Sequence, residues 1–153
     1  MGATFLRFAL AWCFSLGAGV STPALADTSD EAITATQDFF AQMSAENLAG
    51  VAAYVAPQGF SETAPETEKL LQLDIKAFET LFKSGRKIDL RASDLQAQAF
   101  GDTVIVTGKR VGSITAPGAI SVDGRLAFTM IWLKGGGGWQ MKHLHLSALP
   151  TAN

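Results

Sequence analysis

Apolar residues recur at helical spacing along the first part of the chain. Thr28 and Glu31 fit a capping box, and large apolar side chains then repeat about once per helical turn through Met43. A second apolar segment follows at residues 48–55 and ends before Pro57, which cannot continue a helix. These patterns predict two helices, the first of which begins near Thr28.

A third helix is predicted from about Pro65 or Glu66 to Ser84. It carries one apolar stripe at helical spacing: Leu71, Ile75, Phe78 and Phe82. Gly85 then supplies a natural stop at its C-terminal end. The segment before this helix, residues 60–66, is predicted to be a loop.

The apolar pattern changes from helical to alternating after Gly85. Four segments are predicted to be β-strands: residues 87–100 with an interruption at Ser93–Asp94, residues 103–114, residues 126–134 and residues 139–149. The glycine run 135–138 leads into a strand rather than a helix, so it predicts a hairpin loop and not a phosphate-binding loop. Helices followed by a run of strands are typical of the α+β class, in which helices cover one face of an antiparallel sheet.

The two faces of this predicted sheet can be separated, because successive strand residues point to opposite sides. The even-numbered residues are strongly apolar and include a single cation. We expect them to lie on the concave face, to pack on the helices and to line a ligand pocket. The pocket residues predicted from these strands are Arg110, Phe128, Met130, Trp132, Leu144 and Leu146.

The odd-numbered residues form a mixed set that is too apolar for a face in water. Examples are Thr129, Ile131, Trp139 and Met141. A sheet that meets water should carry charges there, and one domain of this size has only enough helix to cover one side. We therefore predict a homodimer that forms through the outer face of the sheet.

Residues 1–26 are predicted to be a secretory signal peptide. One cation, Arg7, precedes an uncharged apolar run, and small residues stand before a cleavage site after Ala26. Cleavage would leave one domain, residues 27–153, in the periplasm or outside the cell. The sole cysteine, Cys13, would leave with the signal peptide, so this domain could form no disulfide. The alternative is that the segment is retained as an anchor helix.

The charge of the cleaved chain disfavours nucleic acid as a partner. The whole sequence has a formal charge of −2, and the loss of Arg7 makes it about −3. Proteins that bind nucleic acid present a basic surface instead. After residue 26 no apolar run is long enough to span a membrane, so no membrane contact is predicted for the cleaved chain.

The order of these segments resembles a known superfamily. Three helices followed by "GDTVIVTGK", "LAFTMIWLK", a glycine turn and "WQMKHLHLS" resemble the nuclear transport factor 2-like superfamily, especially SnoaL-like proteins and the association domain of calcium/calmodulin-dependent protein kinase II. The resemblance covers nearly all of residues 27–153 and implies a cone, in which a curved sheet wraps around helices and leaves an apolar pocket at its wide end. Isomerases, dehydratases, cyclases and binding or oligomerising domains all share this fold, so it fixes no function.

The resemblance also implies a role for Arg110. The kinase association domain has several arginines in its pocket; one corresponds to Arg110, whereas two others correspond to Met130 and Leu146 in this chain. This implies a mostly apolar pocket with one cation, suited to an apolar ligand with a carboxylate or an enolate-like oxygen. The alternative is that Arg110 lies near the rim and pairs with a surface acid, because a buried arginine needs a partner.

Both histidines, His143 and His145, point the same way from the last predicted strand. A zinc site needs at least three protein ligands, and no cysteine or further histidine remains after residue 26, so no metal or cofactor is predicted. A catalytic pair would need a pocket position, against which the alternation of the strand argues. We expect both imidazoles to support the fold, bonded to a neighbouring strand, to Ser147 or across the dimer contact.

Candidates for acid–base chemistry are few. Tyr54, the one tyrosine, falls on the second predicted helix and could reach the pocket mouth, or could be a core residue with its hydroxyl at the surface. Asp38 could face the pocket or solvent, and no acid is visible on the even-numbered face, although an isomerase needs a carboxylate base. We therefore expect a secreted domain that binds a small apolar ligand, acidic or not. The alternatives are a small isomerase or dehydratase, and a purely oligomerising module.

Overall fold

The computed structural model describes residues 23–149 except 66, 68 and 123, with side chains from Asp27 onward. Residues 1–22, most of the predicted signal peptide, lie outside the described residues. Residues 23–26, at its end, form the first turn of helix α1, which spans Pro23–Ser44. None of the helices in the described part of the chain is long and apolar enough to cross a membrane.

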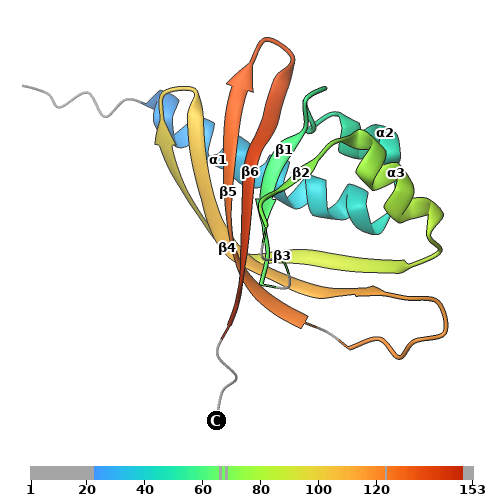
Figure 1. Ribbon diagram of the computed structural model, residues 1–153. Coiled ribbons are helices and arrows are strands. Elements are labelled where there is room, and N and C mark those ends of the chain that lie inside the picture. The colour runs from blue at the N-terminus through green and yellow to red at the C-terminus, as the bar shows by residue number, and fades with distance from the viewer. Residues whose placement is uncertain (1–22, 66, 68, 123, 150–153) are drawn as a thin grey trace, which may run out of the picture.

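The described residues form three helices and one six-stranded sheet (Figure 1). Helix α1 is followed by two shorter helices, α2 (Leu48–Ala52) and α3 (Ile75–Lys83). The strands are β1 (Phe60–Thr63), β2 (Leu71–Leu73), β3 (Lys87–Phe100), β4 (Thr103–Thr115), β5 (Gly124–Gly135) and β6 (Gly138–Ala148). They lie in the order β2-β1-β6-β5-β4-β3.

This architecture confirms the predicted α+β class and the cone arrangement. The sheet curves around the helices, and β3, β4, β5 and β6 form the predicted antiparallel meander (Figure 1). One pair departs from the prediction of an antiparallel sheet, because β1 runs parallel to β6 and places Ser61 beside His143 and Thr63 beside His145.

The segment between α2 and β3 differs from the prediction in two ways. The expected loop at residues 60–66 contains β1, and the expected third helix is shorter, because Leu71–Leu73 form β2 and pair with β1. Helix α3 begins only after Asp74, whose carboxylate accepts hydrogen bonds from the backbone N–H groups of Lys76 and Ala77. This cap satisfies two amides that the helix cannot satisfy itself, and it fixes the start of the helix.

The predicted start of the first helix is also wrong. Helix α1 begins at Pro23, a residue well suited to the first helical position, so Thr28 and Glu31 lie inside the helix rather than at its cap. Glu31 instead accepts hydrogen bonds from Lys134 and from the indole of Trp139. These contacts fasten the β5–β6 hairpin to α1.

The alternation of strand residues is confirmed for the concave face. Seven even-numbered residues of β4, β5 and β6 are buried under the helices: Val104, Val106, Phe128, Met130, Trp132, Leu144 and Leu146. Met141 was expected on the outer face but has no exposed surface. The register of β6 shifts here, since Ile131 pairs with His143 whereas Trp132 pairs with Met141. The extra residue, Lys142, is a β-bulge that reverses the alternation towards the glycine turn.

A buried hydrogen bond joins α1 to the centre of the sheet. Thr36, which has no exposed surface, accepts a bond from Trp132 Nε1 at 2.9 Å and donates one to the carbonyl of Ala32 at 2.9 Å. Around this bond, Phe39 packs edge-on against Trp132 and Phe78, with ring centroids 6.5 Å and 6.1 Å apart. The hydroxyl of Thr36 and the indole N–H of Trp132 are therefore paired within an aromatic cluster.

The end of α1 meets the outer edge of β3. The hydroxyl of Ser44 accepts a hydrogen bond from Leu90 N at 2.8 Å and lies 3.0 Å from Leu90 O. Further along β3, the predicted interruption is present, because the pairing with β4 shifts between Ser93 and Gln96, and Asp94 adopts a φ of 54°. The strand is thus held by a helix at one end and bent by a bulge in its middle.

Candidate functional site

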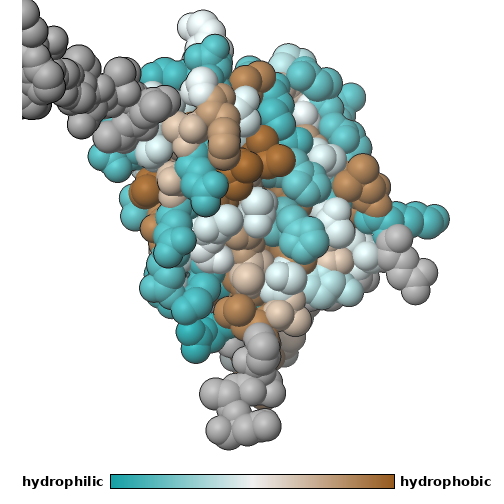
Figure 2. All heavy atoms as spheres, turned by 90° about the vertical axis from the view of Figure 1, so that its left-hand side faces the viewer, coloured by the Kyte–Doolittle hydropathy of each residue, from teal (hydrophilic) through white to brown (hydrophobic). Residues whose placement is uncertain are grey.

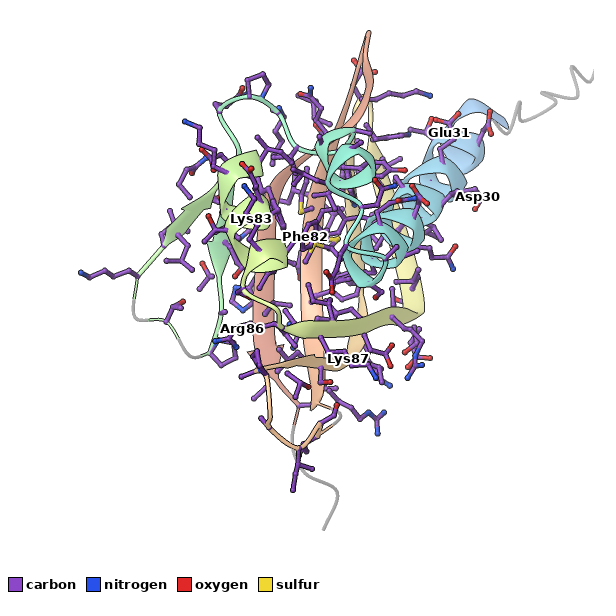
Figure 3. The ribbon with its side chains drawn as sticks, turned by 90° about the vertical axis from the view of Figure 1, so that its right-hand side faces the viewer. Asp30, Glu31, Phe82, Lys83, Arg86 and Lys87 are labelled. Carbon is purple, nitrogen blue, oxygen red and sulfur yellow. The ribbon has the colours of Figure 1, made fainter. Side chains whose placement is uncertain are left out.

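The wide end of the cone holds a partly open cavity of about 160 Å³. It lies between α1, α3 and the concave face of the sheet, on the side shown in Figure 3. Its wall is mostly aromatic and aliphatic, with one cation and one carboxylate: Phe39, Phe40, Met43, Phe60, Glu62, Leu73, Phe78, Leu81, Leu90, Arg110, Ile114, Leu144 and Leu146. A concave, mostly apolar space with a few convergent polar groups is the usual form of a small-molecule site.

Two charged residues reach this wall from opposite parts of the sheet. Arg110 stands on β4 opposite Leu126, and Glu62 stands on β1 opposite Leu144. Both side chains are partly buried, and the Nε atom of Arg110 is fully enclosed. A charge in such surroundings interacts more strongly with a ligand than it would in water, because the local dielectric constant is lower.

Glu62 is the charged residue of the cavity wall that the sequence did not predict. It was assigned to a loop, so its orientation could not be read from alternation. In the structure Phe60 and Glu62 share the inward face of β1, and both Phe60 and Ala64, which follows the strand, are buried. The alternation Phe-Ser-Glu-Thr-Ala was present in the sequence as a signal, but it covers too few residues to distinguish a strand from a loop.

Three of the predicted pocket residues line the cavity: Arg110, Leu144 and Leu146. The others on the same face, Phe128, Met130 and Trp132, lie deeper and fill the core instead. Phe128 packs against Phe40 with ring centroids 5.6 Å apart. The cavity is therefore confined to the end of the cone that is lined by α3 and β1, away from these large side chains.

Tyr54 lies away from the cavity wall, just after the end of α2. Its hydroxyl donates a hydrogen bond to Asp38 Oδ2 at 2.7 Å, and Gln42 donates one to Asp38 Oδ1 at 3.0 Å. Burial, followed by the bond to Asp38, raises the pKa of Tyr54 to about 12, while the bonds from Tyr54 and Gln42 lower the pKa of Asp38. The pair therefore keeps a neutral phenol beside a carboxylate and ties α1 to the segment after α2.

Both histidines lie on the outer face of the sheet. His143 is half-buried, and its Nδ1 atom lies 2.8 Å from the hydroxyl of Ser61 on β1. His145 is exposed, and Ser147 is half-buried on the same face. His143 thus bonds to a neighbouring strand, as expected for a histidine that supports the fold. Within the described residues, no three His, Cys, Asp or Glu side chains are grouped so that they could hold a metal ion.

The single tyrosine makes the environment of Tyr54 directly measurable. We expect its ultraviolet phenolate absorbance to appear with a midpoint near pH 12 in the folded protein, against about 10 for an exposed phenol. Because folding raises the pKa of Tyr54, the protonated tyrosine stabilises the folded state. This stabilisation is complete below about pH 10, the pKa of an unfolded tyrosine, and is lost as the pH rises through the pKa of the folded protein. Asp38→Asn should lower the midpoint without abolishing the shift, since burial is the largest cause. A midpoint near 10 while circular dichroism still reports a folded chain would contradict this assignment.

Solved structures show the same fold. A CaMKII hub from S. rosetta has a TM-score of 0.66 and 22% sequence identity, covering 79% of this chain and 96% of that one. An NTF2-like protein of unknown function in nutrient uptake from Rhodospirillum rubrum has a TM-score of 0.65 and 22% identity, covering 77% and 98%. A candidate dehydratase of the NTF2-like family from Streptomyces avermitilis has a TM-score of 0.68 and 18% identity, covering 85% and 100%. At these identities the likeness establishes the fold alone.

Among the curated proteins, none matches the sequence. A family model for the SnoaL-like domain matches residues 33–152, which is most of the chain. The match includes every strand of the sheet and the greater part of α1. The resemblance that the order of helices and strands implied is thereby confirmed, and the chain belongs to the SnoaL-like family.

Proposed function

We propose that this protein binds a small, mainly apolar molecule with one acidic or hydrogen-bonding group in the cavity at the wide end of the cone. The observation that carries the proposal is the wall itself, which is apolar except for Arg110 and Glu62. The cavity of about 160 Å³ is close in size to an engineered cavity of roughly 150 Å³ that admits benzene. A six-membered ring or a short alkyl chain would fit.

The two charges define what the polar end of the ligand can be. The guanidinium of Arg110 can donate hydrogen bonds to a carboxylate or an enolate-like oxygen, and Glu62 can accept one from a hydroxyl or an amide. A polar group without such a partner would bind poorly, because its desolvation would not be offset. The site therefore favours a ligand with an apolar body and a polar group that can face Arg110 or Glu62.

A second function, acid–base catalysis, is favoured by the position of Glu62. An isomerase or dehydratase needs a carboxylate base at the pocket and a group that stabilises the developing oxyanion. Glu62 and Arg110 supply one group of each kind on the same wall. A ligand that leaves the cavity chemically altered would support this function over simple binding.

We further propose that the protein is exported and acts as a homodimer. The signal-like segment at residues 1–26 supports export to the periplasm or beyond. The outer face of the sheet supports the dimer, because hydrophobic side chains gather on it within a hydrophilic border (Figure 2). Partly buried Ile131 and Thr129 lie there together with exposed His145. Hub and association domains of CaMKII share this fold, and their names indicate assembly.

Ligand binding can be tested by filling the cavity. Leu146→Phe should extend a ring into the void with little strain and weaken the binding of hexanoate by at least about tenfold, measured by isothermal titration calorimetry. The matched control is Leu133→Phe, the same change at a residue that is 38% exposed on the outer face, which should leave the affinity unchanged. Equal affinities for both variants would place the ligand elsewhere.

The dimer can be tested by adding a charge to the middle of the outer face. Thr129 lies between Thr107 and His145, so Thr129→Arg would bring like charges together in two apposed copies. We expect the sedimentation coefficient to fall to that of a monomer. Thr34→Arg, on the exposed side of α1, is the control and should keep the dimer. A monomeric parent protein would rule the interface out.

Export predicts a specific N-terminus. Protein recovered from the periplasm or the medium should begin at Asp27, and its intact mass should equal that of residues 27–153. Replacing Ala24 and Ala26 with bulky residues should block cleavage and leave the full mass. Full-length protein found only in the cytoplasm would contradict export.

A further inference from the structure

We propose that the ligand site continues from the cavity into a second hollow on the surface, and that the ligand is an elongated amphipathic anion. Its apolar end would lie in the cavity and its acidic end at Arg86. This inference rests on the proposed binding function and deepens it, because it names the ligand class and a residue outside the cavity that selects for length.

The two hollows share part of their walls. The outer hollow measures about 410 Å³ and is lined by the end of β4, the β4–β5 connection and the turn after α3. Arg110 and Ile114 belong to both walls, so the cavity and the outer hollow meet at these two side chains. A chain too long for the cavity would leave it beside Arg110 and enter this hollow.

The outer hollow matches the chemistry of an anionic amphiphile. It carries two cations, Arg86 and Arg110, and its described wall residues include no carboxylate. Ile120 and Val122 stand at its side with 90% and 74% of their surface exposed, which is unusual for large aliphatic residues. An alkyl chain lying against them would remove this apolar surface from water, and the two guanidinium groups would attract its acidic end.

The wall of the outer hollow is preformed. The hydroxyl of Ser121 lies 2.7 Å from that of Ser113 on β4, and Thr115 donates towards both, at 3.1 Å and 3.2 Å. These contacts hold the segment before β5 against β4. On the other side, a Cβ atom built at Gly85 would lie 3.6 Å from Pro117, so the turn that carries Arg86 lies close to the same connection. Arg86 is labelled in Figure 3 at the end of this turn, just before β3.

The length of the ligand therefore decides whether its acidic end meets Arg110 or Arg86. The cavity alone accepts a group about the size of benzene, so the carboxylate of a short chain would stop at Arg110. The carboxylate of a longer chain would pass into the outer hollow and reach Arg86. Arg86 is exposed and does not line the cavity, so substitutions of Arg86 should not affect short ligands.

The experiment compares hexanoate and dodecanoate by isothermal titration calorimetry. Arg86→Glu should weaken the binding of dodecanoate by at least about tenfold and change that of hexanoate by less than about twofold. Ile120→Ser, which removes exposed apolar surface, should weaken dodecanoate alone. Lys83→Glu makes the same change of charge on α3, where Lys83 pairs with Glu79 outside the hollow, and should affect neither ligand.

The outcomes separate this inference from the proposed function. If hexanoate binds and Leu146→Phe blocks it, but Arg86→Glu leaves dodecanoate unaffected, the cavity is a binding site and the extension is wrong. Equal losses for both ligands, or an equal effect of Lys83→Glu, would also overturn the extension, because they would reflect net charge alone. If neither carboxylate binds to the parent protein, the proposed function fails and the extension fails with it.

Discussion

The hydrogen bond between Trp132 and Thr36 is the contact on which the shape of the domain depends. It joins Thr36 in the middle of α1 to Trp132 on β5, where neither residue is exposed, and both of its polar atoms would be costly to bury unpaired. Because α1 is fixed at this point, Phe39 and Phe40, one turn further along the helix, enter the core and pack on Trp132 and Phe128. The rest of the cone is arranged around this anchored helix.

The cavity follows from how unevenly that core is filled. At the middle of the sheet Phe128, Met130 and Trp132 occupy the full space under α1. On the neighbouring strand β6 the same face carries the smaller Leu144 and Leu146, opposite Met130 and Phe128, and the short helix α3 lines the cavity there. Close packing is reached in the first region and not in the second, so the void lies where Arg110 and Glu62 can reach it. The location of the candidate site thus follows from where Arg110 and Glu62 lie in the sheet, and not from a sequence motif.

The sequence predicted the sheet better than the site. Alternation placed Arg110 and the buried residues of β4, β5 and β6 on the concave face, because a period of two persists over long strands. It failed at Met141, where a single inserted residue reverses the faces. It could not reveal β1 and β2, which are too short to show a period, and the helical spacing of Leu71 and Ile75 concealed the cap at Asp74. Glu62 was lost with β1, since only long-range pairing with β6 makes that segment a strand.

The hydroxyl of Ser44 affects whether another strand can pair with β3 at the edge of the sheet. An unpaired edge of a strand is a template on which another chain can add, and β3 is such an edge. At Leu90 the helix terminus already occupies both backbone groups that a seventh strand would need. Beyond the bulge at Asp94 the described hydrogen bonds include no comparable contact, so a foreign strand could not pair with β3 beside the cavity and would have to pair near Gln98 and Phe100.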